Sequence, residues 1–381
     1  MKKLLTFLFY LLILYYSVFG CINWYYDTII FSVFKEIIII LILFFCFLKD
    51  PNTIKPILVI VASFYILWIL LLAFLSGFSL SALDQLRYYV IWPFIIYISY
   101  YLIDTAEKRM SFLRFIRYIV GMLSLIGLIF LYINNQDFLV PRFQMWAPKS
   151  LTPTNVDLGV TIALVSINEI YRIIIVREKK WLNYAFVVIM LICLILTFSR
   201  TAYLGFIVGI VLIETTKFKG YIKILFTNLI GIILLVVVSL NVLYDNVLFN
   251  IKYFSFESLY DRVTNTWEKA FKYISIFGYG LGKIGRDQNI YVIDNMYLRA
   301  VLDLGVIGFF LIVILASYFF ALKYSKRELH LYNSTKICFI SFIIMSFFTD
   351  TFTLIPATPI LYSLIGISVR SLQEKERKQF G

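Results

Sequence analysis

Residues 181–216 read WLNYAFVVIMLICLILTFSRTAYLGFIVGIVLIETT, two apolar runs separated by a single arginine, Arg200. Each run is close to the length that a helix needs to cross the hydrocarbon core of a bilayer, roughly 17 to 25 residues. The whole chain of 381 residues is 61% hydrophobic and 15% charged. A water-soluble domain of this length cannot bury so much apolar surface in one core, so the pattern predicts an all-α membrane protein.

Similar runs recur along almost the whole chain and predict one polytopic domain, residues 1–381, with about twelve membrane-spanning helices. They lie near residues 4–20, 29–48, 56–76, 87–103, 112–133, 158–176, 181–198, 201–216, 221–244, 297–320, 335–352 and 354–369. Lys35 and Glu36 interrupt the second run. The basic and apolar start of the chain is interpreted as the first helix, because no small-residue cleavage pattern of a signal peptide follows it.

The distribution of Lys and Arg predicts the orientation in the membrane. With the N-terminus in the cytoplasm, about 23 of the 35 basic residues fall in cytoplasmic segments. The inner side then carries a charge of about +14 and the outer side about −1. An even number of spans also puts the C-terminus in the cytoplasm. Since this topology accounts for the net charge of +13, a nucleic-acid partner is not needed and is rejected.

Two outer segments are longer than a simple turn. Residues 134–157 are rich in Pro and Asn and are predicted to form a loop. Residues 245–296 form the large extracytoplasmic loop, in which SLYDRVTNTWEKAFKYI (258–274) has apolar side chains at helical spacing. This spacing predicts an amphipathic helix along the outer membrane surface, followed by the glycine-rich turn FGYGLGKIG (277–285).

Arg200 is the most informative charged residue. It follows the seventh predicted span and faces outward, whereas arginines that merely anchor a helix at the headgroups are enriched on the inner side. A charged residue at the bilayer centre costs about 2.5–3.5 kcal/mol, and less at the interface. The flanking hydroxyl of Ser199 adds a hydrogen-bonding group. We favour a functional role over an anchor.

Other outer charges allow two interpretations. Arg262 on the amphipathic helix and Arg142 in the proline-containing loop are each candidate anion ligands or ordinary solvated charges. Arg299 and Asp303 are four residues apart in one predicted helix and are expected to pair with each other. Asp294, with Asn295, stands at the start of the tenth span, either as a helix cap or as a carboxylate that accepts a proton.

Several classes of chemistry lack the residues that they need. The only histidine, His330, is predicted to be cytoplasmic, and no phosphate-binding loop of the P-loop type occurs. Acidic residues with metal-ligand spacing are missing, and so is metal or redox spacing of the four cysteines. We therefore expect no metal and no cofactor, with the energy of the reaction supplied by the substrate.

The motifs resemble those of the O-antigen ligase and polysaccharide polymerase superfamily of bacterial membrane proteins. TFSRTAYLGF (197–206) is similar to its Ser-Arg signature, and DRVTNTWEKAFKYISIFGYGLG (261–282) to its large outer loop. DNMYLRAVLDLGVIG (294–308) is similar to the ligase motif of His-Asn, nine residues and Gly-x-x-Gly, with Asp294 in place of histidine. TPTNVDLG (152–159) resembles the entry motif of the family. The resemblance covers residues 140–310, and the aspartate is closer to the polymerases.

The resemblance implies a glycosyltransferase fold of the GT-C-like class in the bacterial cytoplasmic membrane. Its implied reaction is metal-independent, inverting polymerisation of oligosaccharide repeat units linked to undecaprenyl pyrophosphate, at the outer face. Beyond these substrates and the lipid bilayer, the implied partners are a chain-length regulator and a flippase. The product is an O antigen, capsule or exopolysaccharide.

Roles for individual residues follow from this chemistry. Arg200 and Arg262 are expected to hold the departing pyrophosphate, because guanidinium groups bind phosphate oxygens in pairs and keep their charge. Asp294 is expected to accept the proton of the attacking hydroxyl. The expected substrate-binding residues are Arg142, Ser199, Asn295, Trp267 and Tyr279.

Two alternatives stay open. A ligase that transfers finished glycan to another acceptor uses the same chemistry. A flippase or secondary transporter belongs to a different class, for which internal repeats and ionisable groups at the bilayer midplane are typical. The sequence has no convincing repeat, and its outer charges lie near the membrane boundary.

Overall fold

The computed structural model describes residues 2–26, 29–49, 56–133, 155–178, 180–197, 199–216, 262–283, 295–321, 329–351, 354 and 356–379. This part of the chain consists of helices and turns and contains no strand. The helices are α1 (Lys2–Tyr26), α2 (Ile29–Lys49), α3 (Pro56–Leu75), α4 (Leu80–Leu102), α5 (Ala106–Ile133), α6 (Asn155–Tyr171), η2 (Arg172–Val176), α7 (Trp181–Leu196), α8 (Arg200–Thr215), η3 (Arg262–Trp267), α11 (Glu268–Phe271), α13 (Met296–Ala321), α14 (Leu329–Met345) and α15 (Ala357–Gln379).

Eleven of the predicted spans coincide with helices, and the remaining one, near 221–244, lies outside the described residues. By length and composition, three helices in the described part of the chain are able to cross a membrane: Ala106–Ile129, Val156–Val176 and Met296–Ala321. Shorter apolar helices are Val61–Leu75, Trp181–Leu196 and Ala357–Leu372. The fold is thus that of a helical membrane protein. Lys35 and Glu36 interrupt the apolar run but not the helix, because α2 runs through both residues.

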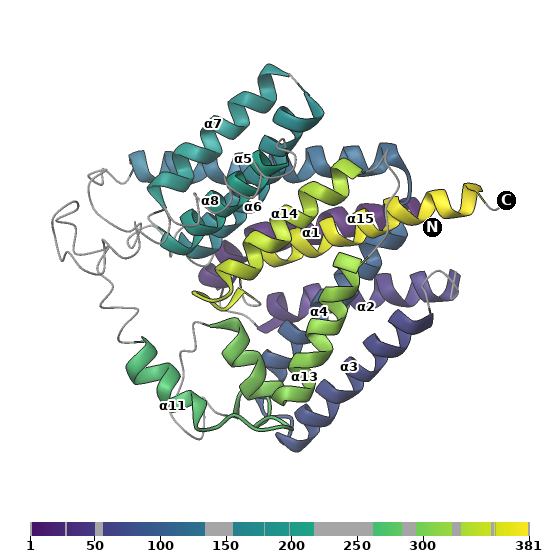
Figure 1. Ribbon diagram of the computed structural model, residues 1–381, viewed down its shortest axis with the longest axis vertical. Helices are drawn as coiled ribbons and strands as arrows, with labels where there is room; N and C mark the ends of the chain where they lie inside the picture. Colours follow the sequence, from purple (N-terminus) through teal and green to yellow (C-terminus); the bar gives the residue numbers. More distant parts are fainter. Residues whose placement is uncertain are drawn as a thin grey trace.

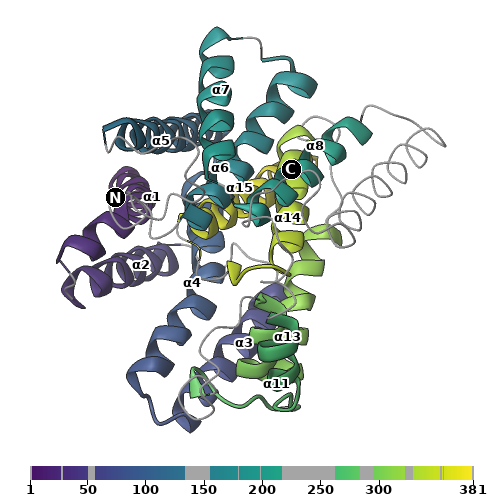
Figure 2. The same cartoon turned by 90° about the vertical axis from the view of Figure 1, so that its left-hand side faces the viewer.

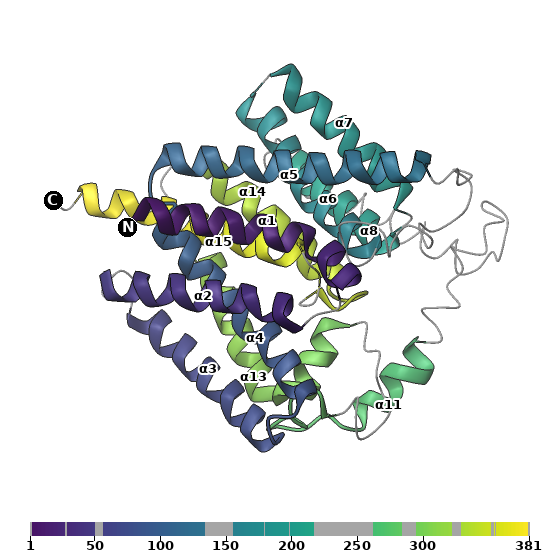
Figure 3. The ribbon, with the colours of Figure 1, turned by 180° about the vertical axis from the view of Figure 1, so that it is seen from behind.

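The long helices run between two ends of the bundle (Figure 1). Both termini lie at one end, which we call the terminal end, and α11 lies at the opposite side of the molecule (Figures 1 and 3). The opposite end, called the loop end, carries the α3–α4 turn (Ser76–Ser79), the α7–α8 turn (Thr197–Ser199), Asn295 and the segment after α14 (Ser346–Asp350).

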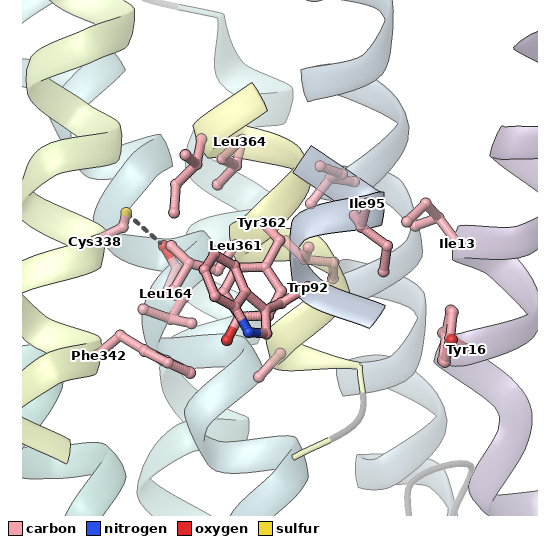
Figure 4. Close-up of a cluster of buried hydrophobic side chains, with 14 of the residues drawn as sticks. Ile13, Tyr16, Trp92, Ile95, Leu164, Cys338, Phe342, Leu361, Tyr362 and Leu364 are labelled. Atoms are coloured by element: carbon pink, nitrogen blue, oxygen red, sulfur yellow. Dashed lines mark hydrogen bonds between the residues drawn. The ribbon is translucent and has the colours of Figure 1, made fainter. Parts of the chain in front are cut away.

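The helix α15 lies in the middle of the bundle (Figure 2). It packs against α4 on one side and against α14 and α6 on the other, and every side chain from Pro356 to Val369 is buried. The ring of Tyr362 in α15 lies 5.8 Å from that of Trp92 in α4, and the Cys338 thiol of α14 donates to the Leu164 carbonyl at 3.4 Å (Figure 4). Aromatic and aliphatic packing therefore joins the helices around α15.

Ion pairs fasten the terminal end. The Nζ atoms of Lys2 and Lys108 lie 2.6 and 2.7 Å from the two carboxylate oxygens of Asp104, which stands between α4 and α5. Burial raises the pKa of Asp104, but the hydrogen bonds from Lys108 and Lys2 outweigh burial and bring the pKa down to about 2. The start of α1 is thereby tied to the α4–α5 junction.

A second ion-pair cluster is largely enclosed, and of its side chains Glu178, 25% exposed, reaches the surface. The Glu169 carboxylate of α6 lies 2.7 Å from Arg117 Nε of α5 and 3.1 Å from Arg172 Nη1. Arg172 Nη2 also pairs with Glu178 at 2.6 Å. The four charges sum to zero, as buried ion pairs require, and the cluster joins α5 and α6 at the junction that leads to α7.

Candidate functional site

The turn between α7 and α8 presents Arg200 at the loop end. Ser199 caps α8, its hydroxyl accepting a hydrogen bond from the Ala202 N–H at 3.4 Å, and Arg200 is the first residue of the helix. The turn packs closely on α6, because a Cβ added to Gly159 would lie 3.0 Å from both Ala202 Cβ and Thr197 Oγ1. The Arg200 side chain is half-buried. The expected substrate ligand Ser199 is itself buried and serves as the cap.

The end of α14 brings two distant parts of the sequence together. Gly205 of α8 contacts the Met345 side chain at the end of α14. Immediately after Met345, the Ser346 carbonyl accepts the Met296 N–H at 3.0 Å, and the Phe347 carbonyl accepts Asn295 Nδ2 at 3.1 Å. Arg200 precedes Gly205 by five residues, about 7.5 Å along a helix axis. The start of α8 and the start of α13 therefore border the same end of α14.

Asn295 is held on both sides of its amide. Besides the bond from Nδ2 to Phe347, its Oδ1 accepts the Leu298 N–H at 2.9 Å, which is the geometry of a helix cap. Asp294, the predicted proton acceptor, precedes this cap and lies outside the described residues, as does Arg142. Arg262 begins η3, with a backbone that the structure describes and a side chain that it does not.

A buried ionic network adjoins Asn295. Arg299 Nε lies 3.7 Å from Asp303 Oδ2, as expected from their spacing, and Arg299 Nη1 forms a second ion pair with Asp350. The Tyr89 hydroxyl of α4 donates to Asp303 at 3.0 Å. One guanidinium between two carboxylates leaves a formal charge of −1. The network ties α13, α4 and the segment after α14 at the loop end.

Sequence analysis missed Asp350 and Tyr89. Asp350 had a usable signal, since it is a single carboxylate near the outer end of a predicted span, on the same membrane side as Arg299. No sequence signal distinguished Tyr89 from the other tyrosines, of which the chain has 28 in all.

The glycine-rich turn locks a break in α13. Gly305 has φ +73° and ψ 177°, which interrupts the helix. Around the break, the Tyr279 N–H donates to the Leu302 carbonyl at 2.7 Å, and the Val306 N–H donates to the Ser275 carbonyl at 3.2 Å. Trp68 Nε1 donates to the Leu304 carbonyl at 2.8 Å. Backbone groups freed by the break thus find partners, which a membrane interior demands.

Two aromatic residues predicted to bind substrate, Trp267 and Tyr279, lie in the segment that precedes α13. Trp267 and Tyr279 pack around a small cluster of Ala270, Leu298 and Leu302. The Tyr279 ring meets Tyr273 edge-on, with centroids 5.7 Å apart. They are therefore joined to the first half of α13, which follows the cap at Asn295, and their contact with a sugar remains a prediction.

The predicted amphipathic helix differs in detail. It ends at Phe271, so Ile274 falls in the following turn. Trp267 packs inward, whereas Phe271 and Ile274 are 57% and 40% exposed. The π-helical winding of η3 changes the angular spacing of its side chains, so one α-helical stripe does not persist.

Of the predicted site residues, Ser199 and Arg200 begin the helix whose Gly205 contacts Met345, and Asn295 binds the segment that follows Met345. Trp267 and Tyr279 pack against the first half of α13. Within the described ranges, no three His, Cys, Asp or Glu side chains gather as a metal site requires. The arrangement offers a half-buried cation at a helix N-terminus, where partial positive charge favours anions.

Comparison with known proteins adds a family. Residues 185–313 match the family model described as O-antigen ligase, and no curated protein matches the chain. The matched segment contains Arg200, Arg262, the glycine-rich turn and the start of α13. It confirms the resemblance drawn from the motifs: residues 185–313 carry an O-antigen ligase domain, which is consistent with the O-antigen polymerase and ligase superfamily.

Proposed function

We propose that the protein polymerises oligosaccharide repeat units carried on undecaprenyl pyrophosphate, at the outer face of the bacterial cytoplasmic membrane. A hydroxyl oxygen of the acceptor unit attacks the anomeric carbon of the donor glycan. The new C–O bond forms with inversion as the bond to the pyrophosphate breaks, and the bonding electron pair leaves with the pyrophosphate. Asp294 receives the hydroxyl proton.

Charge stabilisation of the leaving group is the part of the reaction assigned to arginine. Arg200 and Arg262 bind the pyrophosphate oxygens as negative charge develops there. Hydrogen bonds to a charged group contribute about 1.5–3 kcal/mol each, so two arginines supply a substantial share of the stabilisation. Arg142 is a further ligand for the same anion, and Trp267 and Tyr279 stack on sugar rings.

One observation carries the proposal. The end of α14 contacts both the helix that Arg200 begins and the cap at Asn295, which follows Asp294 in the chain. Arg200 and Asp294 also both belong to the segment that matches the O-antigen ligase family, which supports a shared role for them. A flippase that supplies lipid-linked units and a chain-length regulator are the proposed partners.

The test is an assay of purified protein with one defined lipid-linked repeat unit and no other acceptor. A polymerase gives a ladder of products, because each product is again a donor. Formation of that ladder in detergent, where no gradient exists, also excludes transport as the primary activity. If folded protein forms no ladder of products, the proposal is contradicted.

A ligase is the second candidate, favoured by the description of the matching family model. It transfers preformed glycan to a different acceptor with the same bond changes. The same assay distinguishes the two, since a ligase makes no product until that second acceptor is added.

A further inference from the structure

A lysine is buried inside the helical bundle, away from Arg200. The Lys35 side chain in α2 is 1% exposed, although burying a charge within a membrane protein is costly and usually marks a functional position. Its Nζ lies 3.8 Å from a Glu36 carboxylate oxygen and 5.8 Å from the centroid of the Tyr16 ring. The cation is therefore stabilised in part by a carboxylate and an aromatic face.

A second cation lines the same cavity. Arg87 of α4 and Lys35 border a cavity of about 20 Å³, together with Tyr16, Tyr88, Trp92 and Tyr362. Arg87 Nη2 donates to the Tyr88 hydroxyl at 3.2 Å. Two basic side chains from helices distant in the sequence, Lys35 and Arg87, therefore line one cavity, as in a site for an anionic group.

The Tyr16 hydroxyl is a buried polar group in the wall of this cavity. Tyr16 is 2% exposed, and its hydroxyl oxygen has no hydrogen-bond partner among the described residues. Buried hydroxyl groups are nearly always hydrogen-bonded, so an unpaired one in the wall of a cationic cavity is expected to meet a bound group. The volume takes an atom group about the size of one water molecule, such as one oxygen of a phosphate whose other atoms lie outside.

The cavity lies near the loop end of the bundle. Lys35 is six residues into α2 and Arg87 seven residues into α4, about 9–10 Å from the loop end. Thr358, in the first turn of α15, borders the cavity. Because α15 has α4 on one side and α14 with α6 on the other, it separates the cavity from Arg200, whose helix packs on α6 and α14.

A larger apolar cavity adjoins the cationic one. It has a volume of about 290 Å³ between α4, α13, α14 and α15, and its lining shares Trp92 and Tyr362 with the cationic cavity. These two rings stand between Tyr16 of α1 and Phe342 of α14 (Figure 4). A cationic pocket beside an apolar chamber matches a molecule with an anionic group and a hydrocarbon chain.

We infer that Lys35, Arg87 and the Tyr16 hydroxyl form a second phosphate-binding pocket, whose ligand is the phosphate of an isoprenoid lipid. The inference rests on the proposed function in one respect. A reaction that joins two lipid-linked saccharides must hold two lipid phosphates, and Arg200 accounts for one of them. Lys35 and Arg87 then bind the phosphate of the acceptor lipid, on the other side of α15.

The test counts ligands by native mass spectrometry of the full-length protein with farnesyl diphosphate as the probe. Wild-type protein is expected to bind two molecules, and both the Lys35→Gln/Arg87→Gln variant and the Arg200→Gln variant to bind one. A matched control, Lys272→Gln/Arg114→Gln, removes one exposed lysine and one exposed arginine and should keep both. Unchanged stoichiometry in the Lys35→Gln/Arg87→Gln variant overturns the inference.

Tyr16→Phe separates binding from folding. Its hydroxyl has no partner among the described residues, so its removal should leave thermal stability unchanged or raised, while second-site affinity falls about tenfold. Weaker binding with unchanged stability cannot come from misfolding. Affinity equal to wild type shows that the hydroxyl does not contact the ligand and contradicts the assignment.

Two further probes identify the source of the phosphate. Farnesol lacks the anion and should not displace the second molecule of farnesyl diphosphate. Inorganic pyrophosphate lacks the hydrocarbon chain and should displace that molecule only at about 100-fold higher concentration or more. Equal potency of inorganic pyrophosphate overturns the lipid assignment. Since this readout needs no catalysis, binding without a product ladder would count against the proposed function and not against the pocket.

Discussion

Gly278 and Gly305 meet backbone to backbone, and both hold positive φ angles, +85° and +73°. A Cβ added to Gly305 would collide with backbone atoms of Gly278 and Ile276, which cannot move aside as a flexible side chain does. The contact explains why the motif has glycine at position 305. Only glycine allows both the break in α13 and the close approach of the glycine-rich turn.

The first prediction concerns this contact. Gly305→Ala should lower the free energy of unfolding by more than about 2 kcal/mol, because the strain of a positive-φ, extended-ψ conformation that essentially only glycine adopts, about 1–3 kcal/mol, adds to the backbone collision. Gly77→Ala is the control, since Gly77 has a similar φ of +70° but open space around an added Cβ. Thermal unfolding in one detergent measures both. An equal effect of the two substitutions would show that the backbone contact contributes nothing.

A second prediction concerns Arg200. Arg200→Ala should reduce product formation about 10- to 100-fold with little change in thermal stability, because one charged contact to the leaving group is lost. The rate of ladder formation by purified protein is the measurement. Arg114→Ala removes an exposed arginine from α5 and should have no effect. Full activity of Arg200→Ala would remove this residue from the mechanism.

A third prediction concerns Asp294. Asp294→Asn keeps the size of the side chain but removes its basicity, so we expect a loss of about 10²- to 10⁴-fold in the same assay. Glu268→Gln neutralises an exposed carboxylate on α11 and serves as the control. If Asp294→Asn retains the wild-type rate, another group accepts the proton.

The fourth prediction concerns the enclosed cluster at the terminal end. Glu169→Ala leaves Arg117 and Arg172 without the carboxylate that they share, so the free energy of unfolding should fall by about 3–5 kcal/mol. Glu107→Ala, at an exposed position, should change it by no more than about 0.5 kcal/mol. Unfolding in detergent without substrate is the measurement, and a small effect of Glu169→Ala would show that the arginines find other partners.

The last prediction is a pH dependence. The pKa of Asp104 in the folded protein, about 2, lies below its ordinary value of 3.8. Its ion pairs therefore stabilise the fold fully above about pH 5, and the contribution is lost as the pH falls through 3.8 toward 2. The stability difference between wild type and Asp104→Asn should be present at pH 6 and vanish near pH 2. A difference that is constant over this range would contradict the assignment to Asp104 ionisation.

Much of the fold could be predicted because the bilayer imposes simple rules. A run of about 20 apolar residues has to form a helix, since its backbone groups find no water to bind. Arg299 and Asp303 could likewise be paired by their helical spacing. The burial of Lys35 could not be predicted, because hydropathy alone does not reveal that this side chain turns inward to a cavity that Tyr16 and Arg87 also line.

The site could be predicted only in part. Ser199 was named as a substrate ligand, but its hydroxyl caps α8, and only the described backbone reveals this bond. Asp350 lies 51 residues after Arg299, and no periodicity links positions so far apart. Trp267 and Phe271 both belong to the predicted apolar stripe, but Trp267 packs near Leu298 and Leu302 whereas Phe271 is exposed, and contacts so distant in the sequence could not be predicted.

The sequence by itself determined the helical membrane fold, the end of the bundle that carries each turn, and the motifs that match the O-antigen ligase family. These properties are local, because they depend on hydropathy, charge and short spacing along one segment. Only the tertiary structure decided that the end of α14 joins the start of α8 to Asn295, and that Lys35 and Arg87 share a cavity. Such contacts are made by helices far apart in the chain, and their packing alone selects which faces meet.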